Sequence, residues 1–331
     1  MMLFDTYNFV FYHDADNDGK FSAAVACLKA KREGDYSYNL FPINYTTKDD
    51  CLNYIYTCIN KHIRCGESCR LVNIYFLDFC PDWEVVGKLS NVAKINADYI
   101  KIYIIDHHLS ARQAWESGGY RYTQHEDVEY IYDNKLSGCQ LTWRFFNKDK
   151  PEPLAITLIG MYDTWKHEDD NIIYFEYGIR LRSDKYEVSS HIIADTSAWN
   201  DLLDPYRSMA LINSIIEEGK IVFKYIHNNA VTYFKAAGYQ HKTKHGSEVE
   251  FLNLAAAGSF NFPAPKRAKL LVSYAYDIVN KKWNVGLKTE YSSEVNCMQL
   301  AQHFGGGGHV GAAGCSVTDL HDLINYIDEH V

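Results

Sequence analysis

Three short apolar runs, each followed by acidic or imidazole side chains, constrain the fold of this sequence more than any other feature. YNFVFY occupies residues 7–12, LVNIYFL residues 71–77 and YIKIYII residues 99–105. β-branched and aromatic residues dominate these runs, which is typical of buried parallel strands. Helical patterns lie between them, such as the Ala-rich segment SAAVACLKAKRE from Ser22. The alternation of strand and helix predicts an α/β fold with a mostly parallel sheet flanked by helices.

The polar side chains that follow these runs should meet at one edge of the predicted sheet, because open parallel sheets bind ligands outside the carboxyl ends of their strands. Any single Asp here could instead cap a following helix. Adjacent imidazoles after a buried strand, however, have no obvious packing role. The pattern therefore predicts a ligand site, and its candidate residues are His13, Asp16, Asp18, Asp78, Asp106, His107 and His108.

The spacing D-x-D-x-D-G from Asp14 to Gly19 also opens an EF-hand calcium loop. An EF-hand needs a bidentate Glu at the twelfth loop position and a helix before the loop. This sequence has Val25 at that position and a strand-like run before it. The remaining interpretation is that His13, Asp16 and Asp18 are ligands of a metal ion. Their mixture of imidazole and carboxylate groups suits manganese or similar ions.

Charge and cysteine usage limit the classes of function. The net charge of -9 argues against a protein that coats long nucleic acid, but it leaves short nucleotides as ligands. The nine cysteines lack framework spacing, which is typical of reduced thiols in a cytosol. Since no run of 18 uncharged apolar residues and no export pattern occurs, we expect a cytoplasmic protein without a membrane span. No obligate protein partner is inferred.

A structural zinc site is a further alternative for part of the chain. His62, Cys65 and Cys69 could supply metal ligands. Structural zinc sites use four ligands, and no second CxxC pair follows these residues. Surface-loop thiols are therefore the preferred interpretation.

The run IIDHHLSA contains the motif that names the DHH phosphoesterase superfamily, and YHDADNDG resembles the first motif of that family. The second motif, an Asp that ends a strand, matches Asp78 in IYFLDFCPD. The fourth matches Asp163 in LIGMYDTW, after a helix that follows SGCQLTW. All four motifs occur in the order of the family, so the chain resembles its catalytic domain.

The resemblance implies two divalent metal ions. One ion would bind His13, Asp16 and Asp78. The ligands of the other would be Asp18, Asp78, His107 and Asp163. Ions about 3.5 to 4 Å apart activate a shared hydroxide and stabilise the charge that grows on phosphorus. Manganese is the predicted metal, with magnesium and cobalt as alternatives, and Asp78 and His107 are predicted to be catalytic.

His108 and Asp106 are assigned roles by the same resemblance. His108 is similar to the family residue that contacts the scissile phosphate or protonates the leaving oxygen. We therefore expect it to be both catalytic and substrate-binding. Asp106 is expected to orient the loop around the metal-binding imidazole.

The C-terminal part of the chain predicts a smaller α+β domain with a mixed sheet. FLNLAAAG, KLLVSYAYDIV and KWNVGLKTE have the composition of strands, and VNCMQLAQHF has that of an amphipathic helix. We predict a catalytic domain over residues 1–190, a linker and connecting helix over 191–228, and a substrate-binding domain over 229–331.

The run FGGGGHVGAAGC resembles the glycine-rich loop of the DHH-associated domain of oligoribonucleases and single-strand exonucleases. Its glycines are expected to expose consecutive N–H groups to a phosphate, with His309 as a further donor; a flexible linker is the alternative. Lys288 stands where the family usually has Arg, so the charge is kept but bidentate binding is lost. The predicted phosphate-binding glycines are Gly305, Gly306, Gly307 and Gly308.

Together these resemblances imply a metal-dependent phosphoesterase that hydrolyses phosphodiester bonds of short single-stranded oligonucleotides, as exonucleases and oligoribonucleases do. Hydrolysis of a small nucleotide, either a 3',5'-bisphosphonucleotide or a cyclic dinucleotide, is the alternative. A binding module that captures nucleotides without cleavage is a non-enzymatic alternative, but it would be expected to have degenerate metal motifs. Inorganic pyrophosphatases resemble only the first half of the chain and lack the GGGH run.

Overall fold

The computed structural model describes residues 6–32, 38–44, 53–54, 71–96, 99–119, 127–188, 196–253, 268–289 and 294–331. The chain forms two compact units. One comprises Met1–Thr164 and Glu168–Lys220, and the other Trp165–His167 and Ile221–Val331. The domain boundaries expected after residues 190 and 228 stay predictions. The alternative zinc ligands His62, Cys65 and Cys69 lie outside the described residues.

The first unit is built on a five-stranded sheet whose order is β2-β1-β3-β4-β5. All neighbouring strands are parallel, which confirms the predicted parallel sheet. β2 and β3 lie on opposite sides of β1, so a crevice is expected at the carboxyl ends of β1 and β3, where the strand order reverses. The strands are β1 (Thr6–His13), β2 (Tyr38–Ile43), β3 (Leu71–Leu77), β4 (Tyr99–Asp106) and β5 (Val128–Tyr132).

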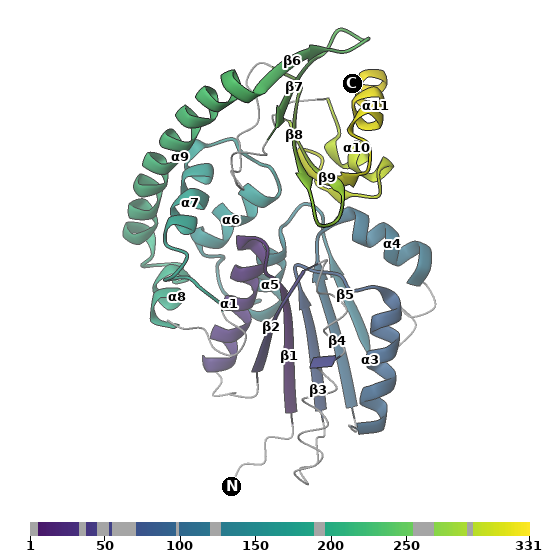
Figure 1. The fold of residues 1–331 in the computed structure, drawn as a ribbon. Coiled ribbons are helices and arrows are strands. Elements are labelled where there is room, and N and C mark those ends of the chain that lie inside the picture. Colours follow the sequence, from purple (N-terminus) through teal and green to yellow (C-terminus); the bar gives the residue numbers. More distant parts are fainter. Residues whose placement is uncertain are drawn as a thin grey trace. The chain divides into compact units, whose positions relative to one another are not determined.

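Helices cover both faces of this sheet (Figure 1), so the strands are apolar on both sides. Side chains of β1 alternate between two cores. Val10 and Tyr12 pack with α1 and α5, whereas Phe9 and Phe11 pack with α3 and α4. The helices of this unit are α1 (Asn17–Arg32), α3 (Trp83–Asn96), α4 (Leu109–Gly119), α5 (Gly138–Phe146), α6 (Leu154–Asp163), α7 (Asp170–Leu181), α8 (Thr196–Leu202) and the first part of α9 (Met209–Ala237).

One polar pair lies between the central strands β1 and β3. Asn8 is directly opposite Asn73 in the strand register, and the Asn73 amide donates to Oδ1 of Asn8 at 2.9 Å. Asn8 is buried. A buried amide requires a hydrogen-bond partner, and Asn73 supplies one to Asn8 in the observed register.

The second unit contains a six-stranded sheet in the order β10-β11-β9-β8-β7-β6. It is mixed, as predicted, because β7 and β8 are parallel while the other neighbours are antiparallel. Side chains of α10 (Cys297–His303) and α11 (Leu320–His330) share a core with those of the sheet. The strands are β6 (Gly238–Lys242), β7 (Glu248–Asn253), β8 (Leu270–Asp277), β9 (Lys282–Lys288), β10 (Gly307–Gly308) and β11 (Ala312–Val317).

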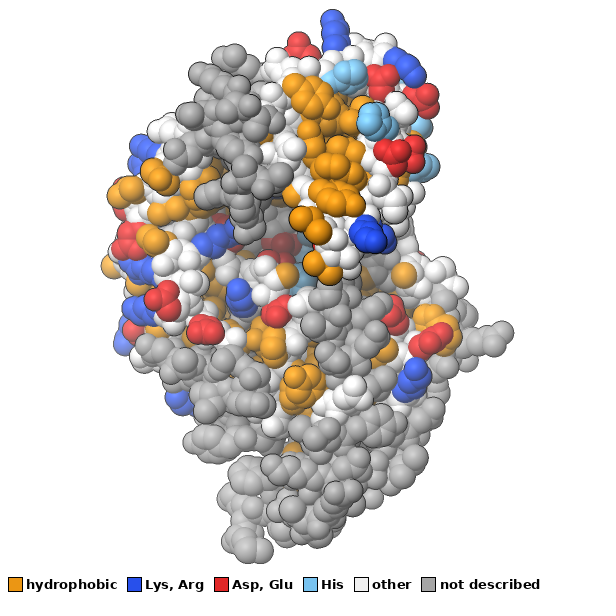
Figure 2. Space-filling view, in the orientation of Figure 1, with side chains coloured by type: hydrophobic (Ala, Val, Ile, Leu, Met, Phe, Trp, Pro, Cys, Tyr) orange, Lys and Arg blue, Asp and Glu red, His pale blue; other side chains and the backbone are white. Residues whose placement is uncertain are grey.

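Small and polar side chains line the other face of this sheet. They line an open groove of about 710 Å³, whose lining includes Ser273, Asn284, Ser316 and the first glycines of the GGGGH run, Gly305 and Gly306. Figure 2 shows hydrophobic side chains gathered on the surface over these strands. The exposed apolar residues of the strands and of the turn between β8 and β9 are Tyr239, Tyr276, Ile278 and Val279. Among the described helices, none is long and apolar enough to cross a membrane.

Candidate metal centre

The structure brings all six predicted metal ligands together within the first unit. His13 ends β1, Asp78 follows β3 and His107 follows β4, so three strand ends contribute as the sequence predicts. Asp163 is the last residue of α6. The side chains form two groups whose ligand atoms lie within 4.8 Å of one another. These groups are His13, Asp16 and Asp78, and Asp18, His107 and Asp163.

Asp78 faces both groups, each with a different carboxylate oxygen. Its Oδ2 atom is 3.6 Å from Nδ1 of His13, and its Oδ1 atom is 3.3 Å from Nε2 of His107. Neither oxygen has a hydrogen bond of normal geometry among the described residues, although Asp78 is only 1% exposed. A buried carboxylate without hydrogen bonds requires a neighbouring positive charge, so the arrangement fits a residue that bridges two cations.

The remaining distances complete the two groups. In the first, Nδ1 of His13 is 3.0 Å from Oδ2 of Asp16. In the second, Nε2 of His107 is 3.2 Å from Oδ2 of Asp163 and 3.7 Å from Oδ2 of Asp18. Each group thus combines imidazole nitrogen with carboxylate oxygen, a donor set that suits manganese and similar ions.

The backbone of Asp78 has a left-handed conformation, with φ of 54°. Its N–H donates to the carbonyl of Ile105 on β4 at 2.8 Å, which holds the residue at the end of the sheet. Asp and Asn adopt this conformation more readily than other non-glycine residues because their short polar side chains form local hydrogen bonds. Such strained positions cluster at functional sites.

Burial and mutual repulsion shift the ionisation of the cluster. Burial raises the pKa of Asp78 well above its usual value, and the charges of Asp18 and Asp16 raise it further. Burial and Asp18 likewise raise the pKa of Asp163. Burial alone would lower the pKa of His13, but the neighbouring carboxylates of Asp16 and Asp78 outweigh it and raise the pKa to about 11. Without divalent cations, protons must therefore neutralise this cluster, and the carboxylates would exchange them for metal.

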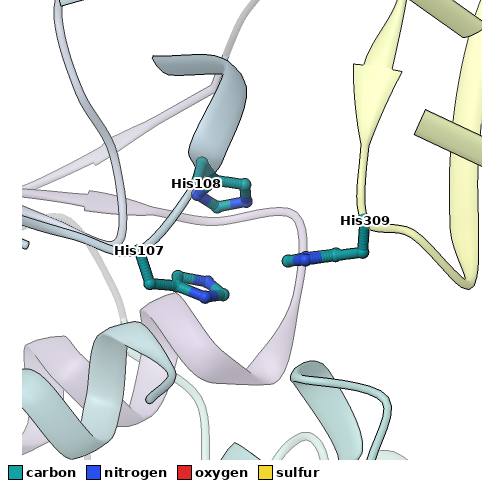
Figure 3. A group of neighbouring side chains, drawn as sticks. All are labelled: His107, His108 and His309. Carbon is teal, nitrogen blue, oxygen red and sulfur yellow. The ribbon is translucent and has the colours of Figure 1, made fainter. Parts of the chain in front are cut away.

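His108 is held by Asp106, the last residue of β4. The two side chains form a hydrogen bond of 2.8 Å between Nδ1 of His108 and Oδ1 of the fully buried Asp106. Figure 3 shows the His107 and His108 rings leaving adjacent positions of the chain after β4. Asp106, expected to orient this loop, therefore orients the His108 imidazole directly.

Two contacts to the metal-binding loop involve residues that the sequence analysis did not select. Ser137 and the first residues of α5 bind the carboxylate of Asp18. Glu176, buried on α7, accepts a hydrogen bond of 3.0 Å from the amide of Asn17, which lies between two predicted ligands. For the contact between Ser137 and Asp18, the sequence offered one signal, the capping box from Ser137 to Gln140. This motif marks the start of α5 but does not indicate what that helix end binds.

The predicted substrate-binding residues outside the first unit belong to the second. Lys288 ends β9, opposite Ala312 of β11, and His309 follows β10. The expected row of N–H groups open to phosphate does not include Gly305 and Gly306. Gly305 and Gly306 donate to carbonyls at the end of α10, and the N–H of His309 donates to Ala312. The bonds to α10 satisfy carbonyls that a helix end leaves without partners.

Close packing explains why glycine is needed in this run. A Cβ atom at Gly306 would lie 2.1 Å from the carbonyl oxygen of Gly314 on β11. The glycines therefore let the chain turn from α10 onto the sheet. The run is an ordered turn, not the flexible linker considered as the alternative.

A parallel α/β sheet with an imidazole and carboxylate cluster at its switch point defines the class of the first unit. No protein-family model and no curated protein matches the sequence. Several solved structures, however, match the fold of this chain. One, a DHH-domain protein described as a member of a family of ribosomal proteins, has a TM-score of 0.62 and 12% identity, over 98% of this chain and 86% of its own. The chain therefore has the fold of DHH-domain proteins, as its motifs predict.

Two looser matches are also found. A pGpG-specific phosphodiesterase from Vibrio cholerae superposes with a TM-score of 0.46 and 12% identity, over 98% of this chain and 96% of its own. RecJ in complex with Mg²⁺, from Thermus thermophilus, superposes with a TM-score of 0.38 and 12% identity, over 98% of this chain and 49% of its own.

Proposed function

We propose that this protein is a metal-dependent phosphoesterase that hydrolyses phosphodiester bonds of short single-stranded oligonucleotides. The observation that carries the proposal is Asp78, whose two oxygens face two separate groups of potential ligands. His13 and Asp16 would hold one divalent ion and Asp18, His107 and Asp163 the other, with Asp78 shared. Bound there, such ions supply Lewis-acid activation of water and of the phosphoryl oxygens. Manganese suits the mixture of imidazole and carboxylate donors.

His108 is the residue proposed to act on the substrate from the protein side. Its Nδ1 atom is engaged by Asp106, so Nε2 is the nitrogen through which the ring would meet the scissile phosphate or the leaving oxygen. The charge of Asp106 favours the protonated imidazole, although burial opposes it, and the result is a raised pKa for His108. A protonated imidazole can donate a proton to a leaving alkoxide.

His108→Gln should lower the rate of hydrolysis by roughly 10²–10⁴-fold, the usual contribution of a general acid or base. Asp106→Asn should also lower the rate, because it removes the carboxylate that orients the His108 ring. Rates would be measured under manganese saturation. His321→Gln is the matched control, because that imidazole is 88% exposed on the second unit. A His108→Gln enzyme with the wild-type rate would contradict the assignment.

The second unit is proposed to bind the nucleotide phosphate. Lys288 and His309 offer the charge and the donor, and the open groove of about 710 Å³ on the same sheet, lined in part by Gly305 and Gly306, has room for a nucleotide. With a net charge of -9, the protein lacks the basic excess of proteins that bind long nucleic acid. Short substrates are therefore proposed.

Lys288→Met should raise the KM for an oligonucleotide by about 10–100-fold, since a hydrogen bond to a charged group contributes roughly 1.5–3 kcal/mol. The kcat should change less, because the substituted group binds substrate rather than the reacting atoms. Lys242→Met on β6 serves as a control for the loss of one positive charge. Steady-state kinetics would separate the two constants, and an unchanged KM for Lys288→Met would remove this residue from the binding site.

The overall proposal is tested by incubating the manganese-loaded protein with di- to pentanucleotides and resolving the products by chromatography. Release of mononucleotides is the expected result. Parallel incubations with a 3',5'-bisphosphonucleotide and a cyclic dinucleotide identify hydrolysis of a small nucleotide instead. Tight nucleotide binding without turnover in manganese, cobalt or magnesium would overturn the proposal in favour of a binding module.

A further inference from the structure

The start of α5 contacts Asp18 with three hydrogen-bond donors. The hydroxyl of Ser137 donates to Oδ1 at 2.8 Å and the N–H of Cys139 donates to the same oxygen at 2.9 Å. The N–H of Gly138 donates to Oδ2 at 2.6 Å. All four residues are buried. Donors that converge on a buried carboxylate from a helix start both orient it and favour its charged form.

These hydrogen bonds leave Asp18 with a restricted capacity to bind metal. A carboxylate has about four lone-pair positions, two on each oxygen. Oδ1 already accepts two hydrogen bonds, whereas Oδ2 accepts one. The oxygen with remaining capacity, Oδ2, is also the one that faces Nε2 of His107 at 3.7 Å. Asp18 is therefore suited to bind an ion through Oδ2 alone.

Gly138 also approaches the bridging residue. A Cβ atom at Gly138 would lie 2.6 Å from Oδ1 of Asp78 and 2.5 Å from its Cβ atom. Such contacts are shorter than packed atoms allow, so any larger residue must displace either α5 or Asp78. The absence of a side chain at this position lets one helix end approach the carboxylates of both Asp18 and Asp78.

We propose that Ser137 and Gly138 are positioning residues that fix Asp18 as a one-oxygen ligand and thereby set the affinity of the ion held by Asp18, His107 and Asp163. The inference rests on the proposed function, because it requires that the cluster binds metal. The other group is held less firmly, since Asp16 accepts one backbone hydrogen bond, from Gly19, and its side chain is 36% exposed, whereas three buried donors hold Asp18. Ser137 donates to Asp18 and not to the shared ligand Asp78, so its loss is expected to affect one of the two ions.

The experiment is a titration with Mn²⁺ in which free manganese is followed by electron paramagnetic resonance. Wild-type protein should bind two ions. Ser137→Ala should weaken one of the two binding constants by roughly 10–100-fold, as loss of a partner that orients a metal ligand does, and should leave the other unchanged. In a His13→Gln background, which disables the first group, Ser137→Ala should weaken the ion that remains.

Asp169→Ala is the matched control, because Asp169 caps a different helix. Its Oδ1 atom accepts a hydrogen bond from the N–H of Asn171 at the start of α7. This variant should lower the melting temperature and leave both manganese constants unchanged. A Ser137→Ala protein that melts earlier but keeps both constants would show that Ser137 only caps α5, and would overturn the inference. Failure of the wild-type protein to bind manganese would instead overturn the proposed function. Gly138→Ala is a second variant, expected to weaken the same ion and, because the added Cβ atom would also displace the shared ligand Asp78, the other ion as well.

Discussion

Asp78→Asn should lower the manganese-dependent hydrolysis of an oligonucleotide by about 10²–10³-fold. The variant removes the negative charge that two ions would share, and stabilisation by such ions is worth several kcal/mol, with each 1.36 kcal/mol equal to about tenfold in rate. Asn is the informative replacement, because it tolerates the left-handed backbone at this position, φ 54°, where Ala would add strain.

Asp14→Asn is the control for this variant. Asp14 lies in the same loop as the ligands but accepts a hydrogen bond from the amide of Asn44 and belongs to neither ligand group. Initial rates over a range of manganese concentrations would be compared for the three proteins. If Asp78→Asn retained wild-type activity at saturating manganese, Asp78 could not be the shared ligand.

Manganese should stabilise the folded protein by a large and measurable amount. At a free concentration about 100 times the dissociation constant, a single site contributes about 2.7 kcal/mol. For a unit of this size the melting temperature should rise by roughly 5–10 °C. Differential scanning calorimetry with manganese and with a chelator measures the shift. The rise should be much smaller in Asp78→Asn, and an equal rise in both proteins would place the bound ion elsewhere.

The same cluster predicts how the stability of the metal-free protein depends on pH. Asp78 and Asp163 have raised pKa values, so the stability linked to their neutral forms is complete below about pH 4 and is lost as the pH rises towards the raised values. The contribution of His13 is complete below about pH 6.5 and is lost as the pH approaches its pKa of about 11. Both effects destabilise the metal-free protein as the pH increases.

Asp78→Asn tests this pH dependence directly, since its amide imitates the neutral carboxyl at every pH. The metal-free variant should therefore melt above the metal-free wild type, by a margin that widens with pH. Melting curves recorded in chelator from about pH 5 to 9 provide the comparison. A wild-type protein that is the more stable of the two at high pH would contradict the electrostatic account. Residues that serve function commonly reduce stability in this way.

Much of the fold followed from local sequence. The run at residues 71–77 has the same bounds as β3, and the runs at 7–12 and 99–105 lie within β1 and β4. Strands buried on both faces leave a strong apolar signal. The grouping of His13, Asp78 and His107 was predictable because the carboxyl ends of neighbouring parallel strands must meet at one edge.

Other parts of the site depend on tertiary packing that local sequence does not encode. A Ser before a helix indicates a cap for its own helix, and only the packing of α5 beside α1 brings Ser137 to Asp18. The glycine run illustrates a different ambiguity. Glycine permits both an open phosphate-binding loop and a tightly packed turn, and in this protein the N–H groups of Gly305 and Gly306 bond to α10.

The amide pair between Asn8 and Asn73 has a consequence for the accuracy of folding. Sliding β1 by one residue against β3 would turn every side chain of β1 to the opposite face and separate the two amides. It would also move His13 away from Asp78, because each ends or follows one of these two strands. A misaligned sheet would therefore deprive the buried amide of Asn8 of this hydrogen bond before any metal is bound.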